Sequence, residues 1–144
     1  MKPVEIAKNV WWVGAIDWNI TNFHGHTYTV KRGTTYNAYL IIDEKITLVE
    51  GVYGPFAQEM FERISKIVDP SKIDYIIANH VETDHSGSFP ELMKICPKAK
   101  VFGTQKCKEG LERMYYLGLD FQVVKTGDKL SLGKKALNFI EAAM

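Results

Sequence analysis

This 144-residue sequence has only two cysteines and lacks long apolar runs. It also has almost no excess of charge of either sign. The two cysteines, Cys96 and Cys107, fit neither a zinc-binding pair nor a secreted disulfide framework, so we expect both to be small buried side chains. Apolar runs such as 39–42 fall far short of the ~20 residues that a membrane helix needs, and the N-terminus lacks a signal-peptide pattern. We therefore expect a cytoplasmic protein without a membrane segment.

The charges are balanced, with 18 Lys and Arg residues against 17 Asp and Glu residues and a net charge of +1. A surface that neutralises many phosphates needs a basic excess, so we expect no nucleic-acid partner. Hydrophobic residues make up 46% of the chain and charged residues 24%, which is typical of an ordinary globular domain. Length and composition together predict one packed core, or part of one.

The pattern of apolar and turn-forming residues predicts strands first, then alternating helices and strands, then strands again. An antiparallel meander is expected over 10–13, 27–31, 36–42 and 46–50. Helices are expected over 55–68, 88–96 and 104–117, alternating with strands over 73–78 and 100–103. The last strands are expected over 121–124, 129–132 and 136–141, the final two as a hairpin. This order predicts an α/β fold of α+β type, with a mixed sheet and helices on one face.

Two local signals mark the starts of predicted helices. Ser88, followed three residues later by Glu91, predicts a capping box. Thr104 is predicted to cap the helix that contains Cys107.

The segment between the strand 73–78 and the helix after Ser88 is short and polar, and it contains His80, Glu82, Asp84 and His85. Side chains converge on ligands where a strand of an open α/β sheet reaches its carboxyl end. A mixture of imidazole and carboxylate suits divalent iron, manganese or zinc, and four candidate ligands could serve two metals. The alternative is a solvated loop in which Asp84 or Glu82 interacts with the positive end of the following helix.

These motifs resemble the flavodiiron proteins, also called A-type flavoproteins or rubredoxin:oxygen oxidoreductases, whose catalytic domain has the metallo-β-lactamase fold. The resemblance rests on the motif His80-x-Glu82-x-Asp84-His85 with the Ser-Gly-Ser that follows, and on segments 13–18, 23–25 and 33–39. Hydrolases of the same superfamily usually have His at the position of Glu82. The carboxylate there is typical of the diiron branch and favours iron over zinc.

The resemblance implies a role for each residue of the motif. His80 and Glu82 would bind the iron nearer the flavin, and Asp84 and His85 would bind the second iron. In some members the histidine at the position of His85 turns away and water takes its place. His24 would lie over the diiron pocket and donate a hydrogen bond or proton to bound O2 or NO, although the residues alone indicate only an ordinary loop histidine.

The chain also departs from the family at single positions. The family usually has Asp where Glu50 stands, at the end of a strand below the site, and Tyr is common where His26 stands. Glu50 is expected to relax the geometry around the ligands.

The resemblance implies reduction of O2 to water, or of NO to nitrous oxide, at two non-haem irons with electrons from FMN and a rubredoxin-like or other donor. It also implies that residues 1–144 are the first half of a metallo-β-lactamase-like αββα sandwich. The second half and the flavodoxin-like domain that binds FMN are expected to be absent, and no Gly-rich phosphate loop occurs here. The exposed inner face of the sheet predicts a homo-oligomer or a complementing second half.

Two alternatives stay open. One is a metal-dependent hydrolase of the same superfamily, with a metal-bound water as the nucleophile, which Glu82 disfavours. The other is a non-catalytic metal-binding fragment in which the half-site holds one loosely bound ion or none.

Overall fold

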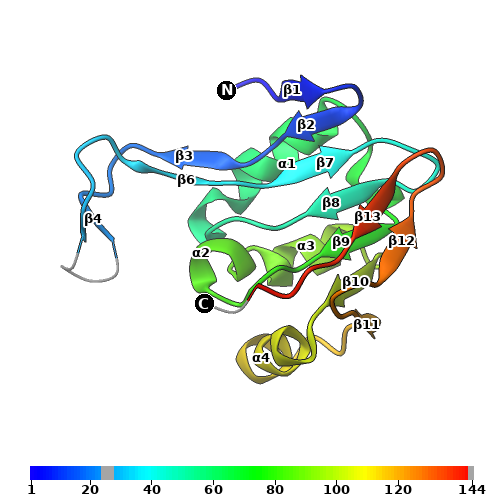
Figure 1. The fold of residues 1–144 in the computed structure, drawn as a ribbon. Coiled ribbons are helices and arrows are strands. Elements are labelled where there is room, and N and C mark those ends of the chain that lie inside the picture. Colours follow the sequence, from blue (N-terminus) through cyan, green and yellow to red (C-terminus); the bar gives the residue numbers. More distant parts are fainter. Residues whose placement is uncertain (24–27, 143–144) are drawn as a thin grey trace.

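The main sheet of the protein is mixed, as predicted. The structure is a computed structural model that describes residues 1–23 and 28–142 (Figure 1). The sheet has the order β1-β2-β7-β8-β9-β10-β11. Its strands are β1 (Val4–Ala7), β2 (Val10–Trp12), β7 (Tyr39–Ile41), β8 (Thr47–Val49), β9 (Tyr75–Ile77), β10 (Lys100–Gly103) and β11 (Phe121–Val123). Pairing is antiparallel from β1 to β8 and parallel from β8 to β11.

Within the part of the chain that the structure describes, three pairs of short strands lie outside this sheet. They are β3 (Ala15–Asp17) with β6 (Thr34–Tyr36), β4 (Asn22–Phe23) with β5 (Tyr28–Thr29), and β12 (Lys129–Ser131) with β13 (Ala136–Asn138). The first pair extends away from the sheet as a two-stranded arm, with β4 near its far end (Figure 1). The hairpin predicted near the end of the chain is confirmed as β12 and β13.

The predicted strand over 36–42 is wrong as one element, because the chain changes partner within it. β6 pairs with β3, whereas β7 pairs with β2. Between them, the carbonyl of Ala38 accepts a hydrogen bond from the backbone N–H of Val13 at 2.9 Å. The side chain of Asn37 accepts another from Nε1 of Trp12 at 3.0 Å. The strands β1 and β3 were not predicted, because runs of three or four residues carry little periodicity.

The three predicted helices are confirmed in place, and the described residues add two short helical elements, η2 (Pro70–Lys72) and α2 (Thr83–Ser86). The others are η1 (Gly54–Phe56), α1 (Ala57–Ser65), α3 (Phe89–Ile95) and α4 (Gln105–Tyr115). In Figure 1, α1 and α3 lie on one face of the main sheet and the hairpin β12–β13 lies on the other. The longest described helix, α4, has 11 residues, and none of the described helices has the length and apolar character needed to cross a membrane.

The two predicted helix caps have different outcomes. The hydroxyl of Thr104 accepts a hydrogen bond from the backbone N–H of Cys107 at 3.2 Å, which confirms that cap. The capping box at Ser88 is wrong, because the Ser88 hydroxyl accepts from the backbone N–H of Val52 at 3.0 Å instead. This buried contact joins the segment after β8 to the start of α3.

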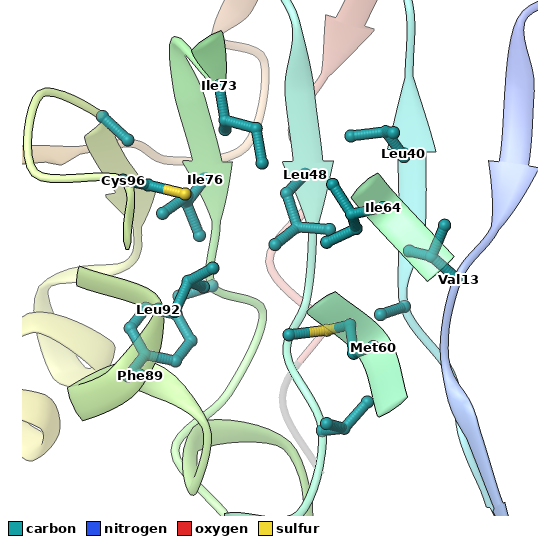
Figure 2. Packing of buried hydrophobic residues seen from close by; sticks show 14 of the residues in the cluster. Val13, Leu40, Leu48, Met60, Ile64, Ile73, Ile76, Phe89, Leu92 and Cys96 are labelled. Atoms are coloured by element: carbon teal, nitrogen blue, oxygen red, sulfur yellow. The ribbon is translucent and has the colours of Figure 1, made fainter. Parts of the chain in front are cut away.

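The core lies between the sheet and the helices α1 and α3, as Figure 2 shows. Leu40, Leu48 and Ile76 stand opposite one another on three neighbouring strands. The helices cover them with fully buried side chains, among them Met60, Ile64, Phe89 and Leu92. Burial of each such side chain is worth roughly 1.5–3 kcal/mol. Cys96 and Cys107 are buried and unpaired, as predicted.

Candidate metal centre

The first two residues of the site follow two neighbouring parallel strands and lie at one edge of the sheet. Glu50 directly follows β8, and His80 follows β9 by three residues. Because β8 and β9 are parallel, their carboxyl ends meet at the same edge. The backbone N–H of Glu50 also donates to the carbonyl of Ile77 at 2.9 Å, which fixes Glu50 beside the chain that leads to His80.

The motif that follows is partly helical rather than a plain loop. Helix α2 contains Asp84 and His85, and Glu82 stands at its N-cap position. Among the described residues, the Glu82 side chain makes no capping hydrogen bond. Its carboxylate therefore does not cap α2 by a hydrogen bond, and Asp84 lies in the first turn of the same helix.

Helix α4 holds this short segment in place from one side. The Ser86 hydroxyl donates to the carbonyl of Val81 at 2.8 Å and lies 2.9 Å from the hydroxyl of Tyr115. Val81 in turn packs over Gly110, where an added Cβ would lie 2.8 Å from a methyl carbon of Val81. Contacts with two residues of α4 therefore fix the backbone on both sides of Glu82 and Asp84.

Each imidazole has a carboxylate at its Nε2 end. Nε2 of His80 lies 3.4 Å from Oε2 of Glu82, and Nε2 of His85 lies 3.6 Å from Oδ2 of Asp84. The two ring centroids are 4.4 Å apart. The structure thus divides the four predicted ligands into His80 with Glu82 and His85 with Asp84.

The Glu50 carboxylate lies beside both imidazole rings at their Nδ1 atoms. Its Oε2 atom lies 3.3 Å from Nδ1 of His80 and 3.3 Å from Nδ1 of His85. Its Oε1 atom accepts a short hydrogen bond from the backbone N–H of Asn79. The carboxylate is 6% exposed, and Glu50, His80 and His85 form a compact group of possible metal ligands.

Burial perturbs the pKa of two of these groups. Removal from water raises the pKa of Glu50 to about 8, and the charges of Asp84 and Glu82 add to this rise, against a hydrogen bond from Asn79 that lowers it. Burial, and then the neighbouring His80, lower the pKa of His85. Within the described part of the chain, Oε2 of Glu50 and Nδ1 of His85 are buried without a hydrogen-bond partner. Two imidazoles among three crowded carboxylates are a donor set that fits divalent cations.

The sequence analysis found four of these five side chains. His80, Glu82, Asp84 and His85 are brought together, whereas His24 and His26 lie outside the described residues. Glu50 was noticed only as a departure from the family. Its position at the end of the strand beside β9 is the signal that places it in the site.

A family model matches most of the chain. Residues 34–144 match the family described as ODP family beta lactamase. The chain belongs to this family. The match includes Glu50 and all four motif residues, and it confirms the predicted metallo-β-lactamase-like fold.

Named relatives of this ODP family chain confirm the resemblance to flavodiiron proteins. A nitric oxide reductase of Moorella thermoacetica is 49% identical over 99% of the chain and 36% of that protein. A rubredoxin-oxygen oxidoreductase of Megalodesulfovibrio gigas is 41% identical over 100% of the chain and 36% of that protein. The structure matches the crystal structure of the flavodiiron protein from Giardia intestinalis with a TM-score of 0.90 and 34% identity, covering 96% of this chain and 34% of that one. The chain spans about a third of the length of these relatives.

Proposed function

We propose that this chain is the amino-terminal part of a flavodiiron oxidoreductase and supplies four metal ligands to a non-haem diiron site that reduces O2 or NO. The observation that carries the proposal is the pairing of each Nε2 atom with its own carboxylate. His80 and Glu82 would hold one iron, and His85 and Asp84 the other. The two irons, with further electrons from FMN, would supply the electrons that O2 or NO accepts.

The chain's own residues bind and orient the metals in this proposal. Oxygen and nitrogen donors on a four-residue helix and its N-cap are held by the Ser86 and Tyr115 contacts, so the pairs keep their spacing. The side chains of His80 and Glu82 are 36% and 44% exposed, against 18% and 28% for His85 and Asp84. The first pair is therefore the more open to groups that approach from outside this chain.

The remaining parts of the enzyme lie beyond these residues in our proposal. The second half of the metallo-β-lactamase-like domain would add further ligands, and a flavodoxin-like domain would bind FMN. A rubredoxin-like or other donor would supply FMN with electrons, as the name of one relative suggests. The proposal includes a cytoplasmic location, where the unpaired Cys96 and Cys107 would stay reduced.

We also propose that the chain is partnered, by a second copy or by a complementing half. Support comes from Ile140, which follows β13 and is 78% exposed, and from Val123 on the terminal strand β11, which is 48% exposed. Light scattering of the purified chain tests this part, and a monomer at all concentrations would contradict it.

The metal assignment is tested by loading the chain with ferrous iron without oxygen and measuring bound iron against Glu82→Gln, Asp84→Asn and the double variant. We expect each single variant to lose one ion and the double variant to lose both. Glu91→Gln, in the exposed first turn of α3, is the matched control and should bind as the parent does.

Two results would overturn the assignment. One is iron binding that neither Glu82→Gln nor Asp84→Asn reduces. The other is an equal loss in Glu91→Gln. Zinc bound in strong preference to iron by the parent chain would instead favour the hydrolase.

A further inference from the structure

We propose that Tyr36, on the two-stranded arm, is a positioning residue of the metal centre. Its buried ring supports residues 51–56, and helix α2, with the proposed ligands Asp84 and His85, packs against the same residues. The inference rests on the proposed metal site and deepens it, because it adds a residue that is far from the ligand motif in the sequence and would bind no metal itself.

The chain that follows β8 lies directly against α2 and its C-terminal end. The backbone N–H of Ser88 donates to the carbonyl of Val52 at 3.0 Å, and the Ser88 hydroxyl accepts from the N–H of Val52 at 3.0 Å. An added Cβ at Gly51 would lie 2.6 Å from the carbonyl oxygen of His85. Because such close-packed contacts leave no gap, a shift of this chain displaces α2 and the side chains that it carries.

Tyr36 packs against the same segment. Its ring centroid lies 5.7 Å from that of Tyr53 and 5.3 Å from that of Phe56, both in tilted arrangements that aromatic pairs favour. Between these two residues, an added Cβ at Gly54 would lie 3.1 Å from the carbonyl oxygen of Gly87, the C-cap residue of α2. The residues that contact Tyr36 therefore flank one that contacts the end of α2.

The arm holds Tyr36 in a fixed place. The Tyr36 hydroxyl donates to Oδ2 of Asp17 at 3.1 Å, and its backbone pairs with Ala15 in the ladder of β3 and β6. At the base of the arm, Nη1 of the buried Arg63 donates to the carbonyl of Gly14 at 2.6 Å. Gly14 in turn leaves no room for a Cβ against the carbonyl of Tyr36. Helix α1 and the strand β3 thus fix the tyrosine, which is 2% exposed.

This arrangement predicts that the two metal positions respond differently to Tyr36. Asp84 and His85 lie within α2, which packs against the supported segment. His80 and Glu82 precede α2, and Val81 between them packs against α4. Loss of the Tyr36 ring should therefore weaken the position of Asp84 and His85 alone, by about 10-fold, as is typical for groups that orient ligands.

The first test is amide hydrogen exchange of the 144-residue chain without metal, measured by NMR. Tyr36→Leu removes both ring contacts, and we expect the N–H groups of Gly87 and Ser88 to exchange about 10-fold faster as this segment opens. The reference is the N–H of Ala78, which bonds to β10 in the main sheet and should change less. A loss of stability of the whole chain would instead raise all three rates alike.

Three variants separate the ring from other effects. Tyr36→Phe keeps the ring and should restore slow exchange. Leu132→Ala, at a fully buried residue that follows β12, controls for the loss of a core side chain and should leave the ratio of rates as in the parent. If Tyr36→Leu does not fold by circular dichroism, Tyr53→Leu removes one ring contact at a residue that is 40% exposed and decides the question.

Four results of the exchange test overturn the inference. They are an unchanged ratio in a folded Tyr36→Leu, an equal change in Leu132→Ala, an equal change in Tyr36→Phe, and rapid exchange of Gly87 and Ser88 in the parent chain. The third result would assign the effect to the hydroxyl, and the fourth would show that the segment is not held.

The second test is titration with Co²⁺, followed by visible absorption. Tyr36→Leu should weaken, by about 10-fold, the binding event that Asp84→Asn removes, and leave unchanged the event that Glu82→Gln removes. Equal weakening of both events overturns the inference. If the parent chain binds neither Co²⁺ nor ferrous iron, the proposed function fails, and the exchange rates measured without metal still decide whether Tyr36 supports α2.

Discussion

Asp43 and Lys135 are joined across 92 positions of the sequence, because the backbone N–H of Lys135 donates to Oδ2 of Asp43 at 2.6 Å. The N–H of Lys134 donates to the other oxygen at 3.2 Å. Asp43 lies in the turn between β7 and β8, and the two lysines lie in the turn of the β12–β13 hairpin. A backbone hydrogen bond from Lys45 to Leu132 adds to this contact. One aspartate thus attaches the hairpin to the main sheet.

The attachment of this hairpin should weaken in acid. Partial desolvation raises the pKa of Asp43, but hydrogen bonds from Lys135, Glu44 and Lys134 outweigh it and lower the pKa below its ordinary value. Because the pKa is lower in the folded state, the stabilisation is present above the unfolded value of ~3.9 and is lost as the pH falls through the folded value. We expect the amide shifts of Lys134 and Lys135 to titrate with a midpoint below ~3.9. Asp43→Asn should abolish this titration. A midpoint above ~3.9 in the parent chain would contradict the prediction.

The two thiols should resist alkylation in the folded chain. Burial raises the pKa of Cys96 and of Cys107 to about 12, so hardly any thiolate is present at neutral pH. Iodoacetamide should label neither residue in native conditions and both in denaturant, as mass spectrometry would show. Rapid labelling of the native chain would mean that α3 or α4 opens readily.

The hydroxyl of Tyr115 should stabilise the motif segment. Tyr115→Phe removes the contact with Ser86 at 2.9 Å and should lower the free energy of unfolding by ~1 kcal/mol. Tyr116→Phe is the matched control, because the neighbouring Tyr116 is 87% exposed. Chemical denaturation compares the two, and an equal effect of both substitutions would show that the Ser86 contact contributes nothing.

Glu82 should influence which metal the site prefers, if the proposed function holds. Glu82→His replaces an oxygen donor by a nitrogen donor, which favours zinc over ferrous iron. We expect the ratio of bound iron to bound zinc to fall by ~10-fold when both ions compete without oxygen. Elemental analysis measures the ratio, and Glu91→His on α3 controls for an added surface imidazole. An unchanged ratio would remove Glu82 from the ligand set.

Local patterns were sufficient for most of the fold. The strands over 46–50, 73–78 and 100–103 and the amphipathic helices α1 and α4 are regular enough for periodicity to find them. The break between β6 and β7 was missed because the sequence on both sides of it is rich in strand-forming residues. Only the change of partner from β3 to β2 divides them.

The capping box shows how a local signal fails. Ser88 and Glu91 have the right spacing, but Ser88 is fully buried beside the segment that follows β8. The N–H of Val52 is buried there and needs an acceptor, and the Ser88 hydroxyl satisfies it. The buried N–H of Val52, 36 positions away in the sequence, therefore takes the Ser88 hydroxyl as its acceptor. The hydroxyl then does not cap the start of α3.

The sequence by itself determined the types and order of the candidate ligands, because His80, Glu82, Asp84 and His85 are neighbours and need no long-range contact to be recognised together. The tertiary structure alone decided which nitrogen of each ring faces which carboxylate. It also brought Glu50 beneath both rings, since the parallel pairing of β8 with β9 carries a residue 30 positions away from His80 to within 3.3 Å of it. The local sequence limits only the contacts between residues that are neighbours in the chain. Strand pairing and burial decide which residues far apart in the sequence come into contact.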